Sequence, residues 1–421
     1  MAGGGIVHSK VTRRRLLQIA AASGAAAAVA QFKWLPGLGP ERALSASGPV
    51  YRLTTDLGVP ASSSIDVAGA IPEALSRIAA SASAPAGTTT ILLEGFYRID
   101  RAVLLEGLTN MRFAPGISAS GFVRPTQRLQ PDAWPAKVPW YSYIVLRNCQ
   151  DVILEGFAIQ GPLTAPQYNS TLEKAAGLVV QGASQRVTVR GLSVSGVHGD
   201  FITVAEHLQY QPTQILIEGV TGNICGRQMV ADVGGNGLTI RRCHFRNGPR
   251  SGIDIEPSTP LGSHNITVED SVFEDPGLFC IAGGNRRLHR NVVVRRTNFF
   301  GGSGLTKYGP PEGATVGSHQ GLLLEDVTYE WRPNPRGEKA GGSMRIARTE
   351  DIHLIRVNAR FAGPPGLVEG TGEIRNCTFV SDTVFPPNAV VRVCGLTEID
   401  NVGTGPCAAP TSTVKSTKSG K

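Results

Sequence analysis

The sequence predicts an all-β solenoid, in which short parallel strands stack coil upon coil, and three observations support this fold class. A six-residue phrase recurs at intervals of 23 to 35 residues between residues 152 and 357. The charge at one position of the phrase alternates in sign from copy to copy. The composition is rich in turn residues, with 51 glycines, 28 prolines and only 18% charged residues. A fixed core with variable loops at such periods is typical of solenoids.

The repeated phrase reads apolar-x-apolar-charged-x-apolar, and this alternation predicts a β-strand. Shorter apolar runs lie upstream of several copies, at residues 177–180, 201–204 and 252–255, so each coil should supply at least two strands. The copies begin at Val152, Val187, Ile215, Leu238, Ile266, Val292, Leu322 and, in a weaker form, Ile352.

The charged position of the phrase tests this register independently. If its side chains point outward and stack, each carboxylate lies between two guanidinium groups, and each pair contributes a few tenths of a kcal/mol up to about 1 kcal/mol. We therefore interpret the arginines as structural, in preference to a track for a polyanion. The position is occupied in turn by Glu155, Arg190, Glu218, Arg241, Glu269, Arg295 and Glu325.

A helix is expected before the repeats, over residues 66–80, and a strand from Thr90 should open the first coil. The apolar residues at helical spacing are Ile65, Ala68, Ile71, Leu75 and Ile78. This arrangement resembles the N-terminal cap of pectate-lyase-like proteins, and the resemblance covers about residues 50–400. It implies a right-handed parallel β-helix with a short N-terminal capping helix, which covers the core of the end coil. That superfamily includes lyases, hydrolases, epimerases and non-catalytic proteins, so the resemblance implies no single reaction.

The N-terminus, residues 1–46, resembles a twin-arginine signal peptide. Three arginines at 13–15 precede an apolar, alanine-rich run at 19–30, although Leu16 and Gln18 depart from the usual pattern. The run is too short and too weakly apolar for a membrane span, so we expect no stable membrane insertion after cleavage. The protein should be secreted or periplasmic. The expected division places the cap and first coil at 47–100, the β-helix at 101–405 and a disordered polar tail at 406–421.

The charge balance favours an anionic partner. The formal net charge is +8, which suits an acidic polysaccharide, a nucleic acid or a membrane surface. Aromatic residues make up only 6% of the chain and do not interleave with basic ones, which disfavours nucleic acid. An acidic polysaccharide is the preferred partner.

Cysteine positions restrict disulfides and metals. An exported chain with seven cysteines can form disulfides, but Cys243 and Cys377 occupy the same place in distant coils and are expected to fill the interior. Cys394 and Cys407 are the one pair that warrants a test. No cysteine or histidine cluster has zinc spacing, so no structural metal is predicted.

Two carboxylates in the segment 251–257 are the leading catalytic candidates. Ile253 and Ile255 should point inward, so Asp254 and Glu256 should lie on the outer face, about 7 Å apart along the strand. Two such carboxylates can raise one another's proton affinity and divide into acid and base. They could equally hold a calcium ion or form a solvated strand face.

The two preceding coils supply the other catalytic candidates. His198 and Asp200 lie in a glycine-flanked loop that could face the groove roughly 10 Å from Asp254. The Gly-His-Gly element of polygalacturonases is only partly matched, and the other elements of those hydrolases are missing. Arg227 and Arg250 are candidate carboxylate binders. The family resemblance also implies that such an arginine could be the base of a β-elimination.

Other segments carry weaker candidates. Asn285, Arg286 and Arg287, followed by His289, Arg290 and Arg296, form a basic patch that could bind a polyanion or only be solvated. Asp232 should face inward with Val230, which would bury a charge unless the charge is paired or the strand shifts its register. The aromatic side chains of Trp134, Trp140, Tyr141 and Tyr143 could stack on sugar rings or pack on the flank.

These observations lead to two hypotheses about function. The first is an exported enzyme, a polysaccharide lyase or glycoside hydrolase, that acts on an acidic polysaccharide through His198, Asp200, Arg227, Asp254 and Glu256. The alternative is a non-catalytic β-helix that binds surface polysaccharide or an envelope partner. The enzyme hypothesis requires an arginine or histidine from an adjacent coil within reach of Asp254. No cofactor is predicted apart from the calcium ion considered above.

Overall fold

The computed structural model describes residues 47–80, 87–126, 142–284, 287–310, 319–333, 343–363, 366–382 and 390–407. The chain divides into a unit of residues 1–43 and a unit of residues 44–421, and every described residue belongs to the second. The residues expected to form the signal peptide therefore lie outside the description. Within the described ranges no helix is long and apolar enough to span a membrane.

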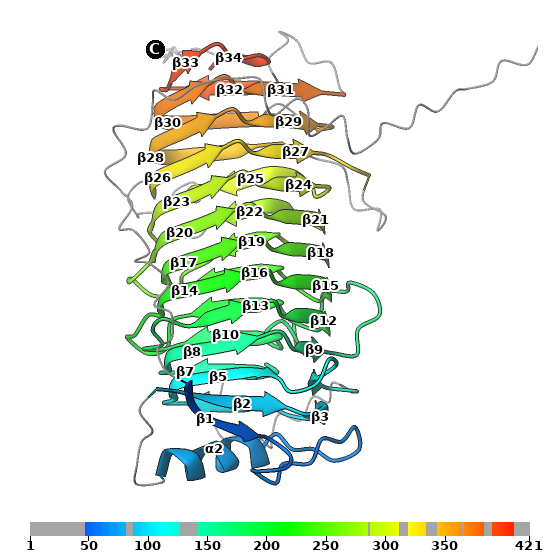
Figure 1. Cartoon of the computed structure of the whole chain (residues 1–421). Helices are drawn as coiled ribbons and strands as arrows, with labels where there is room; N and C mark the ends of the chain where they lie inside the picture. Colours follow the sequence, from blue (N-terminus) through cyan, green and yellow to red (C-terminus); the bar gives the residue numbers. More distant parts are fainter. Residues whose placement is uncertain are drawn as a thin grey trace, which may run out of the picture. The chain divides into compact units, whose positions relative to one another are not determined.

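The described residues form a right-handed parallel β-helix, in which each coil contributes strands to three parallel stacks (Figure 1). The apolar runs that precede the repeated phrase form the first stack, as predicted. This first stack comprises β4 (Val103–Glu106), β7 (Ile144–Arg147), β10 (Leu178–Gln181), β13 (Ile202–Ala205), β16 (Val230–Val233), β19 (Ile253–Ile255), β22 (Phe279–Gly283), β25 (Gly304–Tyr308), β28 (Arg345–Ile355), β30 (Gly366–Arg375), β32 (Val391–Cys394) and β34 (Thr404–Pro406).

The repeated phrase itself forms the second stack. The long strands β28 and β30 run through both stacks and join them into one sheet of 23 described strands. The other members of the second stack are β1 (Ser47–Arg52), β2 (Thr88–Leu93), β5 (Thr109–Pro115), β8 (Gln150–Glu155), β11 (Thr188–Arg190), β14 (Thr213–Glu218), β17 (Asn236–Arg241), β20 (Ser263–Glu269), β23 (His289–Arg295), β26 (His319–Glu325) and β33 (Thr397–Ile399).

A third stack, which follows each copy of the phrase, makes a separate sheet of 11 described strands. Its members are β3 (Phe96–Arg98), β6 (Gly121–Val123), β9 (Ala158–Gln160), β12 (Ser193–Val197), β15 (Thr221–Cys225), β18 (His244–Gly248), β21 (Val272–Pro276), β24 (Asn298–Phe300), β27 (Thr328–Glu330), β29 (Asn358–Phe361) and β31 (Thr378–Ser381).

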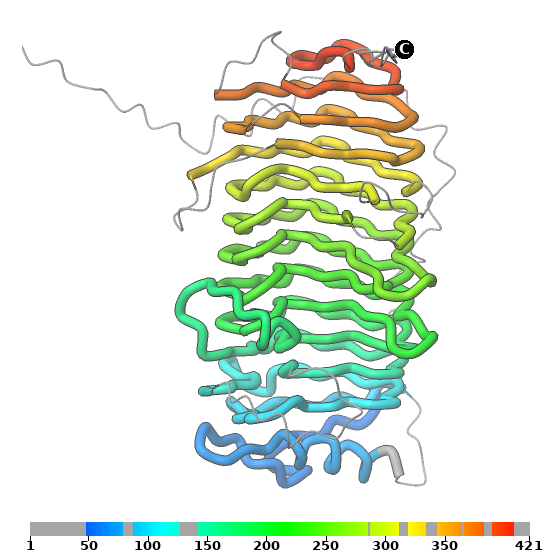
Figure 2. Tube along the Cα trace, turned by 180° about the vertical axis from the view of Figure 1, so that it is seen from behind, coloured from blue at the N-terminus to red at the C-terminus, as the bar shows by residue number. Residues whose placement is uncertain are grey.

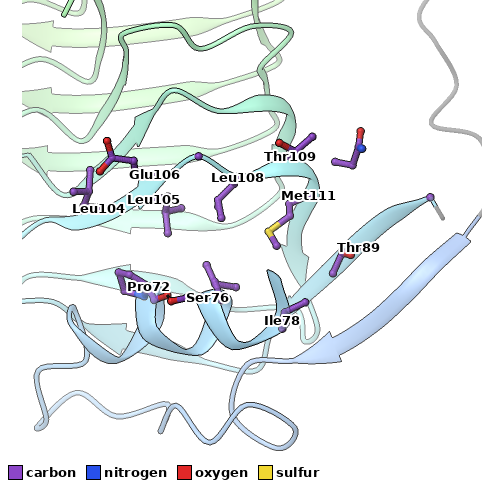
Figure 3. A pocket seen from close by; sticks show the side chains of 14 residues that line it. Pro72, Ser76, Ile78, Thr89, Leu104, Leu105, Glu106, Leu108, Thr109 and Met111 are labelled. Carbon is purple, nitrogen blue, oxygen red and sulfur yellow. Dashed lines mark hydrogen bonds between the residues drawn. The ribbon is translucent and has the colours of Figure 1, made fainter. Parts of the chain in front are cut away.

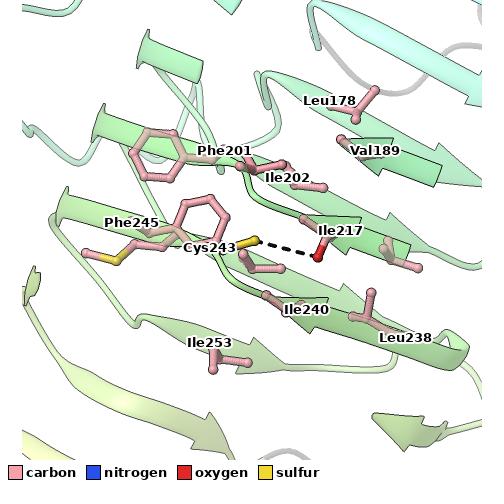
Figure 4. Close-up of a cluster of buried hydrophobic side chains, with 14 of the residues drawn as sticks. Leu178, Val189, Phe201, Ile202, Ile217, Leu238, Ile240, Cys243, Phe245 and Ile253 are labelled. Atoms are coloured by element: carbon pink, nitrogen blue, oxygen red, sulfur yellow. Dashed lines mark hydrogen bonds between the residues drawn. The ribbon is translucent and has the colours of Figure 1, made fainter. Parts of the chain in front are cut away.

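Inward side chains of the three stacks form one core along the solenoid. Aliphatic residues of the second stack face aromatic residues of the third, and Phe245, Phe273 and Phe299 follow one another with ring centroids 5.5 and 5.3 Å apart. Cys243 is buried beside Phe245, and its thiol lies 3.6 Å from the carbonyl oxygen of Ile217 (Figure 4). The expectation that Cys243 and Cys377 fill the interior is confirmed.

The predicted charge row, the outward Glu and Arg side chains that close the second-stack strands, is confirmed. Arg190 lies in register between Glu155 and Glu218. Glu218 accepts hydrogen bonds from Arg190 Nε at 3.0 Å and from Arg241 Nε at 2.7 Å. Two arginines outside the register of the row also bind its carboxylates, through the ion pairs Arg112–Glu155 and Arg356–Glu325, each at 2.8 Å.

The corner after the charge row has a fixed left-handed conformation. Glycines at 156, 191 and 219 adopt positive φ there without steric cost. From the fourth copy onward charged residues take the same conformation, as at Arg296 and Arg356. Their guanidinium groups bind Asp270 at 2.7 Å and Asp326 at 2.5 Å, which offsets part of the backbone cost.

The capping helix is α2 (Ala70–Ala80), four residues shorter at its start than predicted. Asp66 Oδ1 accepts the backbone N–H groups of Ala68 and Asp100, which holds the preceding segment in a turn. Ile65 is consequently exposed, contrary to the expected helix face. A cavity of 620 Å³ separates α2 from the first coil, and Leu75 of the helix lines it together with residues of β4 and β5 (Figure 3).

The last described coil is closed by a disulfide. Cys394, at the end of β32, is bonded to Cys407, with the two Cα atoms 5.4 Å apart. This is the cysteine pair that the sequence singled out as the disulfide candidate to test. Cys407 follows β34, so the first two residues of the expected tail belong to this coil.

Candidate active site

The predicted catalytic residues come from three successive coils of the first stack. Asp254 is the central residue of β19, and Glu256 follows that strand directly. Asp200 precedes β13 and Arg227 precedes β16, each at the corner between the third and first stacks. Parallel stacking brings these corners next to one another.

The predicted alternation along β19 is confirmed. Ile253 and Ile255 are 2% and 1% exposed inside the core. Asp254 and Glu256 therefore project from the outer face, and both are half-buried. The strand therefore keeps the register that the sequence predicted for it.

Asp200 is a buried carboxylate, 1% exposed, that organises this corner. Its Oδ1 accepts the backbone N–H of Gln228 at 2.8 Å, and its Oδ2 accepts from the Thr203 hydroxyl at 2.9 Å and from Arg227 Nη1 at 3.1 Å. Burial raises the pKa of Asp200 to about 6, although the Arg227 charge opposes the shift. Asp200 is thus an internal anchor with no free face for a substrate.

Arg227 links three carboxylates. Its Nη1 binds Asp200, its Nη2 binds Glu256, and its Nε lies 4.0 Å from Glu173. These charges hold the pKa of Arg227 above its ordinary value despite the desolvation that acts in the opposite sense. An arginine with a raised pKa is a poor proton acceptor, which argues against the base role that the family resemblance implied.

Asp254 is held by Gln228 from the coil before it. Gln228 is 1% exposed, and its Oε1 accepts the Ser251 N–H at 2.6 Å. This contact fixes the amide so that Nε2 donates to Asp254 Oδ2. Burial raises the pKa of Asp254 to about 7, and the nearby Glu256 acts in the same direction. Asp254 therefore exchanges its proton near neutral pH, and its Oδ1 has no hydrogen-bond partner among the described residues.

A loop over residues 161–177, between β9 and β10, supplies a wall beside these residues and projects from the stack (Figure 2). Tyr168 donates from its hydroxyl to Glu173 Oε2 at 2.8 Å. The Arg250 guanidinium lies 4.8 Å from the centre of the Tyr168 ring. Because Glu173 also faces Arg227, the loop is tied to the carboxylate site at two points.

Gln228, Glu173 and Tyr168 are site residues that sequence reasoning did not select. The 35-residue interval between the first two phrases was the available signal for the loop, since it exceeds every later interval. Gln228 carried no signal of its own, because its role depends on which way its side chain turns.

His198 is close in sequence to Asp200 but does not join its network. The ring is half-buried and makes no hydrogen bond to a described residue. Burial lowers the pKa of His198, and the Arg124 charge acts in the same direction. His198 is therefore neutral at pH 7.

The described members of the expected basic patch do not all face the same way. Asn285 and Arg286 lie outside the described residues, as do Trp134, Trp140 and Tyr141. Arg287 is exposed in the turn between β22 and β23. His289, in contrast, points into the core, and Arg296 binds Asp270. The sequence pattern was misleading because alternation turns neighbouring residues to opposite faces.

Two further expectations concern buried charge and metal. Asp232 does face inward, in register with Val204 and Ile255, and burial raises its pKa to about 7. Burial thus favours the neutral form of this carboxyl group, whose Oδ1 accepts the backbone N–H of Gly235 at 2.9 Å. Within the described ranges no group of three or more His, Cys, Asp and Glu residues is arranged to hold a metal ion. The cation beside Glu256 is the guanidinium group of Arg227.

No family model and no curated protein matches this sequence. Among solved structures, the A-module of the mannuronan C-5 epimerase AlgE4 from Azotobacter vinelandii has a TM-score of 0.55 at 13% identity, over 85% of this chain and 98% of that one. An exopolygalacturonase from Thermotoga maritima has a TM-score of 0.52 at 11% identity, over 87% and 91%. The surface protein and adhesin PfbA from Streptococcus pneumoniae has a TM-score of 0.51 at 11% identity, over 85% and 100%. At these identities the likeness shows a shared fold, the right-handed parallel β-helix.

Proposed function

We propose that this protein is an exported glycoside hydrolase that acts on an acidic polysaccharide, with Asp254 as proton donor and Glu256 as its partner carboxylate. The observation that carries the proposal is the placement of Asp254 and Glu256 together on the outer face, with Asp254 held by Gln228 and Glu256 held by Arg227. Burial raises the pKa of Asp254 to about 7, while Arg227 neutralises Glu256. Two carboxyl groups in different environments are the usual acid and base of glycoside hydrolysis.

The proposed reaction uses each group once. Asp254 transfers its proton to the glycosidic oxygen as the bond between that oxygen and the anomeric carbon breaks. Water attacks the anomeric carbon, and the Glu256 carboxylate accepts the proton that the water loses. Gln228 positions Asp254 by donating to Oδ2, so the proton on Oδ1 is directed to the substrate. Arg227 keeps Glu256 in place.

Hydrolysis is preferred to β-elimination because of the state of Arg227. A β-elimination needs a base that removes the proton next to a uronate carboxyl group. Arg227 is bound to Asp200 and Glu256, and its raised pKa opposes proton acceptance. An acidic substrate is supported by the net charge of +8 and by the names of two proteins of like fold, a mannuronan epimerase and an exopolygalacturonase. The twin-arginine-like segment supports export to the periplasm or beyond.

The alternative is a non-catalytic polysaccharide binder. It is favoured by one observation, that every carboxylate of the site already has a protein partner. Asp254 is bound by Gln228, Glu256 by Arg227, and His198 contacts neither. An adhesin also shares the fold.

The two functions are separated by an assay of product. The full chain is incubated with polygalacturonate and with alginate, with and without calcium, and reducing ends and unsaturated products are followed. We expect reducing ends to form without unsaturated products, at a rate that falls at least about a hundredfold in the double variant Asp254→Asn, Glu256→Gln.

A matched control makes the same two kinds of substitution, Asp to Asn and Glu to Gln, at positions away from the site. Asp382→Asn with Glu330→Gln replaces exposed, ion-paired carboxylates on the third-stack side of the molecule and should leave the rate unchanged. If the parent forms unsaturated products and the double variant does not, β-elimination would replace hydrolysis as the proposed reaction. Binding without turnover in all three proteins would favour the binder.

A further inference from the structure

The outer face of the first stack continues beyond Asp254 as a column of side chains in register. Asp254 pairs with Ala282 of β22, and Ala282 pairs with Lys307 of β25. Figure 1 shows β19, β22 and β25 in successive coils. Lys307 pairs in turn with Arg345 of β28. The column then passes through Leu367 of β30 to Arg392 of β32.

The three cations of this column are exposed, and the structure pairs none of them with a carboxylate among the described residues. Lys307 Nζ lies 5.8 Å from the centre of the half-buried Phe279 ring, an apolar surface on which a sugar ring could rest. Among the described residues a carboxylate on the same face nearby is that of Glu369, two residues along β30 from Leu367.

Lys307 and Arg345 lie directly opposite one another on adjacent strands, about 4.8 Å apart at the backbone. Like charges in that arrangement destabilise a sheet. The neighbouring charge row shows how this chain avoids such repulsion, since Arg190, Glu218 and Arg241 alternate in sign and are ion-paired. Among the described residues the cations of the first stack lack this compensation, so an anion from outside the protein is a group that would relieve them.

We propose that Lys307, Arg345 and Arg392 form a cation track that binds a polyanionic polysaccharide parallel to the solenoid axis. The track begins two coils from Asp254, and the small side chain of Ala282 leaves the path between them open. This inference rests on the proposed function and deepens it, because it assigns the residues that bind the acidic polysaccharide and gives the direction in which the chain runs. The recognised chemistry is a row of carboxylate or sulfate groups.

Binding of defined polysaccharides tests the track apart from catalysis. The full chain bearing Asp254→Asn is titrated with labelled oligogalacturonate, with its fully methyl-esterified form, and with oligosaccharides of iota-carrageenan, at two salt concentrations. The track variant adds Lys307→Gln, Arg345→Gln and Arg392→Gln. We expect it to bind the anionic probes about tenfold more weakly and with a smaller salt dependence. The methyl-esterified probe should bind weakly to both proteins.

A charge-matched control separates the track from the net charge of the protein. Arg77→Gln, Arg101→Gln and Arg360→Gln remove three exposed cations elsewhere, with 60%, 57% and 59% of their side chains exposed. This control should bind as the parent does. Stronger binding of oligogalacturonate or of the sulfated probe would identify the anion as carboxylate or sulfate.

Three outcomes with the polysaccharide probes would overturn the track. They are equal weakening in the control and the track variant, unchanged binding in the track variant, and no binding of any anionic polysaccharide by the parent. A single-stranded oligonucleotide that binds more tightly than every polysaccharide would also overturn it. Because binding is measured without turnover, a failed track leaves hydrolysis by Asp254 standing, and loss of hydrolysis leaves the track standing.

Discussion

Burial determines the protonation of the site at the scale of single residues. Asp200 lies at a corner before β13 and Asp254 lies on β19 two coils further on, and burial raises the pKa of each, to about 6 and about 7. Asp200 is enclosed by three hydrogen bonds and serves as an anchor, whereas Asp254 lies on the outer face. The difference between an anchor and a candidate acid is thus one of access to the outer face.

The sequence predicted part of this arrangement. Alternation along 253–256 correctly placed Asp254 and Glu256 outside, because a strand inserts every second residue into the core. It could not predict that Arg227 would bind Asp200 and Glu256 together, since that requires the side-chain rotamer of an arginine in a turn. Nor could it select Glu173, which is brought to the site by a loop with no repeated pattern.

Two buried histidines give the molecule an acid-sensitive core. His289 and His319 are 0% exposed and stack with ring centroids 4.0 Å apart, beside Tyr308. Burial lowers the pKa of both, that of His319 to about 4. A folded pKa below the unfolded value of about 6.5 stabilises the fold above pH 6.5, and this contribution is lost as the pH falls toward 4.

We therefore expect His319→Gln to flatten the dependence of unfolding free energy on pH between 6.5 and 4. As the pH falls from 6.5 to 4, the loss of unfolding free energy should be smaller in the variant by about 1.4 kcal/mol per pH unit, as measured by urea unfolding. His244→Gln, at an exposed position, is the control. The raised pKa values of Asp200, Asp232 and Asp254 change the unfolding free energy with pH in the opposite direction. The difference between the parent and the variant therefore isolates the contribution of His319, which the parent curve alone does not. An identical slope in parent and His319→Gln would contradict the account.

The charge row is the clearest feature at the scale of elements, and the sequence predicted its seven members. Each strand that carries a member, from β8 to β26 in the second stack, ends on that residue. Sign alternation was visible in the sequence because the register is the same in every copy. The first stack could not be read so easily, since its copies are short, and its outward residues range from Val179 to Asp254 without a repeated type.

Glu218 is the most enclosed carboxylate of the row, with 7% of its side chain exposed, and it contacts Arg190, Arg241 and Arg242. Glu218→Gln should lower the free energy of unfolding by about 1 to 3 kcal/mol, because three guanidinium groups lose their shared partner. Urea unfolding measures the effect.

The matched control is Glu325→Gln in the same row, where 30% of the side chain is exposed. Its cost should be about 0 to 1 kcal/mol, as for a surface ion pair. Equal costs at the two positions would contradict the view that burial sets the strength of the row.

At the scale of the whole molecule, the parallel stacks bring distant residues into contact. Asp200, Arg227 and Asp254 are far apart in the sequence and lie on consecutive coils. The period of the repeat was therefore enough to predict the fold and the neighbourhood of the site. It could not predict the capping cavity or the course of the loop at 161–177, because neither follows the repeat.

The same stacking separates two kinds of charged surface. The second stack alternates its charges and neutralises them internally, whereas the first stack carries the carboxylate site followed by cations of one sign. The face that we interpret as structural and the face that we propose to bind polysaccharide thus lie side by side on one continuous sheet.

The most direct test of the central claim is the pH dependence of polysaccharide hydrolysis by the full chain between pH 5 and 9. Asp254 acts as a proton donor only while it holds its proton, and burial raises its pKa to about 7. The account predicts that the rate of reducing-end formation falls as the pH rises through about 7 and that Asp254→Asn abolishes this descending limb along with most of the rate. A rate that rises through pH 7, or products that are unsaturated, would contradict it.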